Sequence, residues 1–296
     1  MAYFIFGFST MVMFVALAVL LHLQFGVTGI VNFGIAGFWG LGMYSFGVFL
    51  VHFGFPYAVS LLLATALTGV LAFALGWVIL DMDGQAVLVA TLAFATIVMH
   101  LVTTEKWLTE GVKGLGTIRY PFDLGRSTEA VFLLIVVVIT IAIILYAYKL
   151  HSAPYGRLLL AIKDNETLAR SLSKPTFHQK LIFFTITSTV MGFLGALNGS
   201  INQFLIPRML GPGVTFTVWI ALILGGYRRV LGGLIGAVAA IGLFDLVIET
   251  YTPIPAAYAQ MVPAIKLMLY GLTLMLVILF RPLGILGDRK RSYLHG

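Results

Sequence analysis

Residues 129–149 have the sequence EAVFLLIVVVITIAIILYAYK, in which no charged side chain separates Glu129 from Lys149. About 20 consecutive apolar residues in a helix are enough to cross the hydrocarbon core of a bilayer. A charged residue closes the run at each end. The stretch therefore predicts a membrane-spanning helix.

The whole chain has the same character as this run. Of its 296 residues, 60% are hydrophobic and only 10% are charged, and the mean hydropathy is +1.04. Soluble domains carry roughly 25% charged residues, so a water-soluble fold is excluded. The composition predicts an all-α, polytopic transmembrane helical bundle of about eight or nine spans, with residues 1–296 forming one domain.

Eight further apolar runs are candidates for these spans. No basic residue precedes the first of them, so it lacks the charged start of a secretory signal and is expected to remain as a span. Two of the runs, 85–103 and 214–227, are short enough to be tilted, re-entrant or half-length. The eight runs are residues 3–23, 33–53, 56–80, 85–103, 181–206, 214–227, 230–250 and 258–280.

Basic residues indicate the orientation in the membrane. Cytoplasmic loops are enriched in Lys and Arg, and the region around residues 150–180 has six of them against only Asp164 and Glu166. The six are Lys149, Arg157, Lys163, Arg170, Lys174 and Lys180. This segment and the basic C-terminal tail are expected in the cytoplasm, and the charge-balanced loop 104–128 and the N-terminus outside. The net charge of +7 is thus interpreted as orientation rather than nucleic-acid binding.

Several kinds of chemistry are disfavoured. The chain has no Cys, which removes thiol nucleophiles, Cys zinc sites and iron–sulfur clusters. It also has no P-loop pattern and no HExxH motif, so neither an ATPase site of its own nor a metal site is expected. His22, His52 and His100 lie near span ends, which argues against paired haem ligands in a membrane anchor for a redox enzyme.

Three ionisable residues lie in the last predicted spans. Asp245 and Glu249 are four positions apart and share a helix face; Lys266 lies about a third of the way into the final span. A role at the interface or in helix–helix bonding is favoured for the acids over a proton relay. For Lys266, snorkelling to the interface and pairing with one of these acids are both open.

Residues 150–180 are too long for a turn and too short for a domain. Pro154 precedes a predicted helix over 155–163, and Asp164 or Asn165 is expected to cap a second one over 166–172, with Glu166 paired to Arg170. A compact charged pair of helices suits docking into a groove of a partner protein. The alternative is a solvated amphipathic loop on the lipid headgroups.

Two glycine-rich stretches, 26–42 and 225–237, suggest interrupted helices in an inverted repeat around a pathway. The favoured interpretation, however, is that Gly is common in membrane helices because it permits close packing. Candidate pathway residues are Asn32 in the first stretch and Asn198 and Asn202 on one face of the span 181–206. Gly195 and Gly199 lie close to that face as a GxxxG pair. Hydrogen bonding between helices is the favoured role for these Asn residues.

Several motifs in order resemble the permease subunits of branched-chain amino-acid ABC importers, the LivM/LivH family, with the LivM side favoured. The block at 154–176 (PYGRLLLAIKDNETLARSLSKPT) resembles the family's cytoplasmic coupling segment, and the block at 28–44 (TGIVNFGIAGFWGLGMY) its second-span signature. Three further matches are TLAFATI at 91–97, TEGVKGLG at 109–116 and FRPLGILG at 280–287. The chain departs from the pattern at Ile35, at Ser173, where relatives usually have Gly, and at Arg228 and Arg229.

The resemblance implies a multi-pass permease in the cytoplasmic (inner) membrane of a prokaryote, importing branched-chain or related hydrophobic amino acids. Its implied partners are a second homologous permease in a heterodimer, two cytoplasmic ABC ATPases that carry ATP and Mg, and an external solute-binding protein. No cofactor is expected on this chain. The alternatives are a permease for urea, short amides or another small polar solute, and a stand-alone secondary transporter.

The resemblance also implies which residues couple the permease to the ATPases. In this interpretation Leu158, Leu159 and Ile162 fill the ATPase groove, and Arg157, Lys163 and Arg170 meet an acidic ATPase surface. The full expected coupling set is Tyr155, Gly156, Arg157, Leu158, Leu159, Ile162, Lys163, Asp164, Asn165, Glu166 and Arg170.

Overall fold

A computed structural model describes residues 2–226 and 230–241, together with scattered positions between 265 and 280. In this part of the chain the secondary structure is helical, apart from one isolated bridge between Leu115 and Leu205. The long helices are α1 (Ala2–Leu21), α2 (Ile35–Gly47), α3 (Tyr57–Ile79), α4 (Gly84–Thr104), α6 (Thr128–Ser152), α9 (Thr176–Asn202), α10 (Pro212–Gly225) and α11 (Val230–Ile241). The short α-helices are α5 (Lys106–Thr109), α7 (Pro154–Asp164) and α8 (Glu166–Ser171). The π-turns are η1 (His22–Val27) and η2 (Val48–His52), and the 3-10 turns are η3 (Gly111–Lys113), η4 (Gly125–Ser127) and η5 (Pro207–Leu210).

Seven helices within the described residues are long and apolar enough to cross a membrane, which confirms the all-α polytopic bundle. The run predicted at 85–103 is a full-length helix of 21 residues, α4. The predicted runs 230–250 and 258–280 extend beyond the described residues. Arg228, Arg229, Asp245, Glu249, Lys266 and the basic tail also lie outside them.

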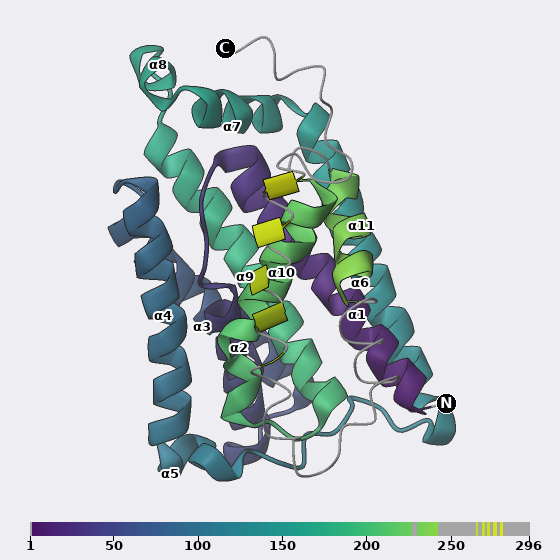
Figure 1. The fold of residues 1–296 in the computed structure, drawn as a ribbon. Coiled ribbons are helices and arrows are strands. Elements are labelled where there is room, and N and C mark those ends of the chain that lie inside the picture. The colour runs from purple at the N-terminus through teal and green to yellow at the C-terminus, as the bar shows by residue number, and fades with distance from the viewer. Residues whose placement is uncertain are drawn as a thin grey trace.

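The two ends of the bundle carry different segments. Helices α7 and α8 lie at one end, and α5 and the N-terminus lie at the opposite end (Figure 1). Leu115 and Leu205 exchange two backbone hydrogen bonds, each with an N···O distance of 2.8 Å. These bonds hold the 104–128 loop against the chain between α9 and η5. The prediction that residues 150–180 and the 104–128 loop lie at opposite ends is therefore confirmed.

Helices α2 and α9 pack with their backbones in close approach. A Cβ atom added at Gly195 would overlap the carbonyl oxygen of Trp39, and one at Gly42 would overlap the carbonyl oxygen of Gly192. Small residues permit such approaches between membrane helices. A Cβ added at Gly199 would make only ordinary contacts, at 3.5 Å from Met43 and Phe46, so Gly195 is the member of the predicted GxxxG pair that sets the packing.

The chain between α1 and α2 is broken inside the bundle. Helix α1 loosens into the π-turn η1, residues 29–34 are not helical, and α2 begins only at Ile35. Figure 1 shows this connection returning along the bundle before α2 starts. Non-helical backbone at membrane depth is stable only where protein or a cavity satisfies its polar groups. The glycine-rich stretch 26–42 therefore contains a helix break, although close packing was the favoured interpretation of its glycines.

The second glycine-rich stretch also begins at a break. Helix α10 ends at Gly225 and α11 starts at Val230, and the two pack closely because a Cβ at Gly225 would overlap the carbonyl oxygen of Gly232. Helix α10 has 14 residues, and with η5 it forms the candidate span Pro207–Gly225 of 19 residues. The described part of α11 has 12 residues. Both proposed roles of the glycines, interrupting helices and permitting close approach, thus occur in this molecule.

Candidate functional site

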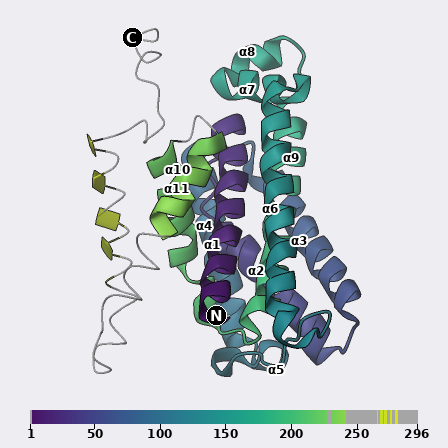
Figure 2. The ribbon, with the colours of Figure 1, turned by 90° about the vertical axis from the view of Figure 1, so that its right-hand side faces the viewer.

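Residues 150–180 fold as the two short helices that the sequence predicts. Pro154 occupies the first turn of α7, where its missing N–H costs no hydrogen bond. Asn165 caps α8, because its Oδ1 accepts a hydrogen bond from the backbone N–H of Leu168 at 2.9 Å. Asn165 rather than Asp164 is therefore the capping residue. The pair of helices covers one end of the bundle (Figure 2).

The apolar face of α7 points into the bundle. Leu159 and Ile162 are 0% and 2% exposed, and a Cβ at Gly156 would overlap the carbonyl oxygen of Leu150. This burial contradicts the expectation that Leu159 and Ile162 fill a partner's groove. A short amphipathic helix buries its apolar stripe against the nearest apolar surface, which here belongs to the same chain. Leu158 and Tyr155 are half-buried.

The exposed face of this segment carries two leucines that the sequence analysis missed. Leu168 and Leu172 are 57% and 66% exposed, and their spacing of four places them on one side of α8. Arg157, Asp164 and Asn165 are also exposed. In the sequence, these two leucines follow the predicted cap of the second helix. Residue spacing alone, however, does not show which leucines remain exposed once the chain has folded.

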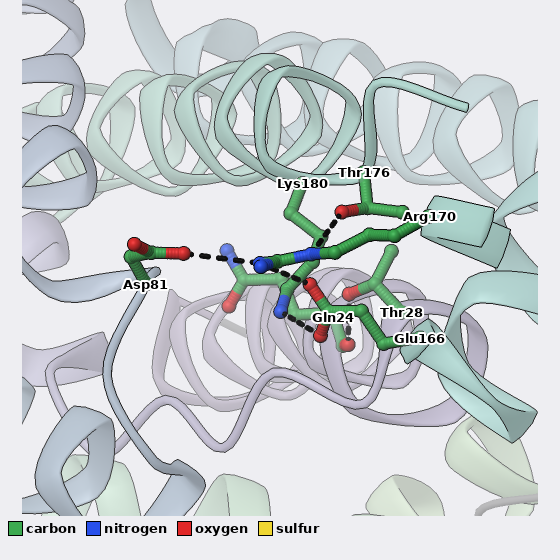
Figure 3. A network of polar contacts seen from close by, with 7 residues as sticks. All are labelled: Gln24, Thr28, Asp81, Glu166, Arg170, Thr176 and Lys180. Atoms are coloured by element: carbon green, nitrogen blue, oxygen red, sulfur yellow. Dashed lines mark hydrogen bonds and ion pairs between the residues drawn. The ribbon is translucent and has the colours of Figure 1, made fainter. Parts of the chain in front are cut away.

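Helix α8 is tied to the bundle by ion pairs (Figure 3). The Arg170 guanidinium lies 3.0 Å from Asp81, in the α3–α4 turn, and 3.1 Å from Glu166, while Lys180 of α9 lies 2.8 Å from Glu166. The predicted Glu166–Arg170 pair is confirmed. Arg170 also donates to the Thr176 hydroxyl at 3.0 Å. Its charge is therefore directed to partners within the chain rather than only to an ATPase.

Glu166 is the centre of this ion-pair group. Burial raises the pKa of its carboxyl, but the hydrogen bonds and charges of Lys180 and Arg170 outweigh that effect, and the net pKa is lowered. A lowered folded-state pKa means that Glu166 contributes stability above its unfolded pKa, which is lost as the pH falls through the folded value. The Glu166 carboxyl is thus ionised at neutral pH.

Ser173 explains one departure from the family pattern. It has a φ of 58°, in the left-handed region that glycine enters without steric cost. The position directly follows the C-cap of α8, where such a conformation commonly ends a helix. A glycine at this position would adopt the turn with less strain than the serine.

A buried polar cluster surrounds the break between α1 and α2. Gln24 is its centre: its amide nitrogen donates to Thr187 at 2.7 Å and to Ser188 at 3.1 Å, and its amide oxygen accepts from Asn32 at 2.8 Å. All four of these side chains are no more than 1% exposed. The cluster joins η1 and the broken segment to the middle of α9.

The same cluster satisfies the backbone of the broken segment. Trp219 of α10 donates its indole N–H to the carbonyl of Asn32 at 3.0 Å, and the N–H of Phe33 donates to Thr91 of α4 at 3.0 Å. The Thr215 hydroxyl donates to the carbonyl of Phe33 at 3.3 Å. Asn32 therefore bonds neighbouring elements, which is the favoured role in the sequence analysis. The sequence did not predict Gln24, because a lone Gln near a span end gives no distinctive pattern.

Asn198 and Asn202 lie away from this cluster. Asn202 donates to the carbonyl of Asn198 at 2.9 Å. Asn198 approaches Met43 of α2 through its amide nitrogen at 3.8 Å, and its amide oxygen is buried without a hydrogen bond. The three asparagines proposed for the pathway thus do not form one site in the described structure.

Replacing Gln24 with Leu should destabilise the bundle by about 2 kcal/mol or more, since each buried polar group left unpaired costs about 1–3 kcal/mol. Thr187 and Ser188 would each lose a hydrogen-bonding partner, and so would the Asn32 amide. Thermal unfolding in detergent measures the effect. Gln85→Leu, at an exposed position in the first turn of α4, is the matched control. Equal midpoints for the two variants would show that the cluster does not stabilise the break.

These features define a class. A bundle of membrane-spanning helices, with a broken helix held by uncharged polar side chains at its centre, is a polytopic membrane protein of the transporter type. The family model for the branched-chain amino acid transport system permease component matches residues 3–278. The chain belongs to this family.

Individual relatives are distant. The chain is 26% identical to the high-affinity branched-chain amino acid transport system permease protein LivM of Salmonella typhimurium, over 78% of this chain and 60% of that protein. It is 22% identical to "Probable branched-chain amino acid transport permease protein LivM" of Methanocaldococcus jannaschii, over 91% and 89% of the two chains. It is also 30% identical to the autoinducer 2 import system permease protein LsrC of an Enterobacter species, over 67% and 57%. The matched region thus spans about 60% of the length of the Salmonella relative.

Proposed function

We propose that this chain is the membrane-spanning permease of an ABC importer in the inner membrane of a prokaryote, and that it moves branched-chain or related aliphatic amino acids into the cytoplasm. The observation that carries the proposal is the family match over residues 3–278. The same family match supports the predicted partners: a second permease, two ATPases that bind ATP and Mg, and an external binding protein.

The two ends of the bundle support the proposed positions of the ATPases and the binding protein. Helices α7 and α8 project at one end of the bundle, and the 104–128 loop with the N-terminus lies at the other (Figure 1). ATPases on the α7–α8 end and a binding protein on the opposite end agree with the excess of basic residues in 150–180. On α8 the exposed Leu168 and Leu172 provide the apolar contact that the ATPase groove would receive.

The polar cluster is compatible with an uncharged route for the solute. Gln24, Asn32, Thr187, Ser188 and Trp219 carry no charge, so they would not bind the ammonium or carboxylate of an amino acid tightly. Selection would then belong mainly to the external binding protein. A coupling-ion site of the kind that secondary transporters use normally contains an ionisable side chain, and this cluster has none.

A second candidate solute is a small polar molecule other than an amino acid. The observation that favours it is the 30% identity to LsrC, whose name records import of autoinducer 2. The two candidates share one mechanism and differ only in cargo. The two candidates are distinguished by which solute competes with the labelled substrate for ATP-dependent uptake.

The test is reconstitution of the complex formed by this chain with the proposed second permease, ATPases and binding protein. Vesicles with ATP on the ATPase side should accumulate labelled leucine, isoleucine or valine, and urea or a short amide should not compete. Omitting ATP or the ATPases should abolish uptake. Accumulation by this chain alone, powered by an ion gradient, would overturn the proposal.

A further inference from the structure

The end of α1 receives a contact from α7 that the proposed function does not use. The Lys163 ammonium donates to the carbonyl oxygen of Gly26 at 2.7 Å and lies 5.9 Å from the centre of the Phe25 ring. Both partners belong to the π-turn η1. The last carbonyls of a helix lack partners within it and carry a partial negative charge, so a cation stabilises this position.

The lysine stem fits against the start of the broken segment. A Cβ at Gly29 would lie 3.1 Å from Lys163 Cγ, and Gly29 has a φ of +76°. A side chain at position 29 would therefore be strained and would press on the lysine. Lys163 is half-buried, and its stem and ammonium contact both sides of the point where the helix ends.

The segment just before α7 makes a second contact with η1. His151, at the end of α6, lies with its Nε2 3.2 Å from Nε2 of His22. Leu159 and Ile162 anchor the middle of α7 in the bundle. The α6–α7 junction and the last turn of α7 thus both contact η1, so α7 keeps these contacts on moving only if η1 moves with it.

From η1 the contacts continue into the core. Gln24 in η1 bonds Thr187 of α9 and Asn32 of the broken segment. The next residue, Phe33, stacks on Trp219 of α10 with ring centroids 4.8 Å apart. The path from α7 to the centre of the bundle therefore consists of direct contacts between side chains and backbone.

The broken segment also has space beside it. A cavity of about 280 Å³ lies between residues 28–31, the α3–α4 turn and the α7–α8 segment, and Lys163 and Glu166 are among the residues that line it. Packed interiors resist displacement because they contain few voids. Here the segment next to Lys163 borders open volume into which it can shift.

We infer that Lys163 is a coupling residue that transmits movement of α7 to the break between α1 and α2. This inference rests on the proposed function, and it assigns Lys163 a target inside the permease rather than on the ATPase. The lysine is a positioning residue: it acts on the solute route through Gly26 and the polar cluster and does not contact the solute.

The experiment compares Lys163→Met with Lys163→Arg in the reconstituted complex, measuring both ATP hydrolysed and amino acid transported. Methionine keeps an unbranched stem but cannot donate to Gly26; arginine can. Lys163→Met should hydrolyse ATP at a rate near that of the unmodified complex and transport about tenfold less solute per ATP, the order expected when a hydrogen bond from a charged donor is lost. Lys163→Arg should recover most of the loss.

The control is Lys174→Met, an exposed lysine in the same cytoplasmic segment, which should leave the ratio of transport to hydrolysis unchanged. Normal coupling in Lys163→Met would overturn the inference. So would a parallel fall of hydrolysis and transport, which would indicate a docking or folding role. Absence of ATP-driven uptake in the unmodified complex would count against the proposed function instead.

Discussion

Replacing Gly195 with leucine is expected to prevent α2 and α9 from packing and to cause a large loss of stability. The reason is that a Cβ at this position would overlap the carbonyl oxygen of Trp39, and backbone, unlike a flexible side chain, cannot rotate away. Overpacking in a close-packed interior typically costs about 1–3 kcal/mol, and a clash with backbone lies at or above the upper end. The yield of folded protein and its unfolding midpoint in detergent measure the effect.

Two other glycines provide the comparison. Gly7→Leu adds the same side chain to α1 where nothing lies within 4 Å, so it should fold with a midpoint close to that of the unmodified protein. Gly42→Leu should resemble Gly195→Leu, because its Cβ would overlap the carbonyl oxygen of Gly192 in the same interface. If Gly195→Leu were as stable as Gly7→Leu, the conclusion that the backbones of α2 and α9 approach closely would be wrong.

Replacing both Leu168 and Leu172 with aspartate is expected to release the ATPases from the permease. These leucines are 57% and 66% exposed on α8, and burying a leucine in a partner groove contributes about 1.5–3 kcal/mol. Losing two such contacts would weaken binding by roughly 100-fold or more. Co-purification of the ATPases with the tagged permease, and titration of purified ATPase onto it, measure the loss.

The matched variant replaces both leucines with methionine, which conserves volume and apolar character and should keep ATPase binding close to normal. The aspartate variant should still insert and fold, since neither side chain is part of the core. If the double aspartate variant still bound the ATPases normally, the docking surface would lie elsewhere, for example around Arg157. Gly156 is less suitable as a probe than these leucines, because any side chain there would overlap the carbonyl of Leu150.

The local features of the 150–180 segment were predictable from the sequence. Pro154 acts through its ring and missing N–H, and Asn165 through its side-chain oxygen, on the first turn that follows each of them, so the start of each helix and the cap of α8 depend on neighbours in sequence. The same is true of the Glu166–Arg170 pair, four residues apart on one helix. The partners of these residues across the bundle, Asp81 and Lys180, required the fold.

The direction in which α7 faces was not predictable. A stripe of Leu159 and Ile162 has the same pattern whether it fills a partner's groove or the chain's own bundle, because periodicity identifies an apolar face but not its neighbour. The expected docking residues were therefore partly wrong. Leu168 and Leu172 remained unrecognised for the same reason.

The sequence by itself determined the class of molecule: long uncharged runs such as 129–149 must be removed from water, and a helix is the structure that satisfies their backbone within the membrane. The glycine-rich stretches did not by themselves determine where helices are interrupted, since glycine is also used for close packing between helices. Only the tertiary structure decided what meets at the interruption. Lys163 and Gly26 are 137 positions apart, and Gln24 and Thr187 are 163 apart. Such contacts depend on how whole helices pack, and local propensity does not specify that packing.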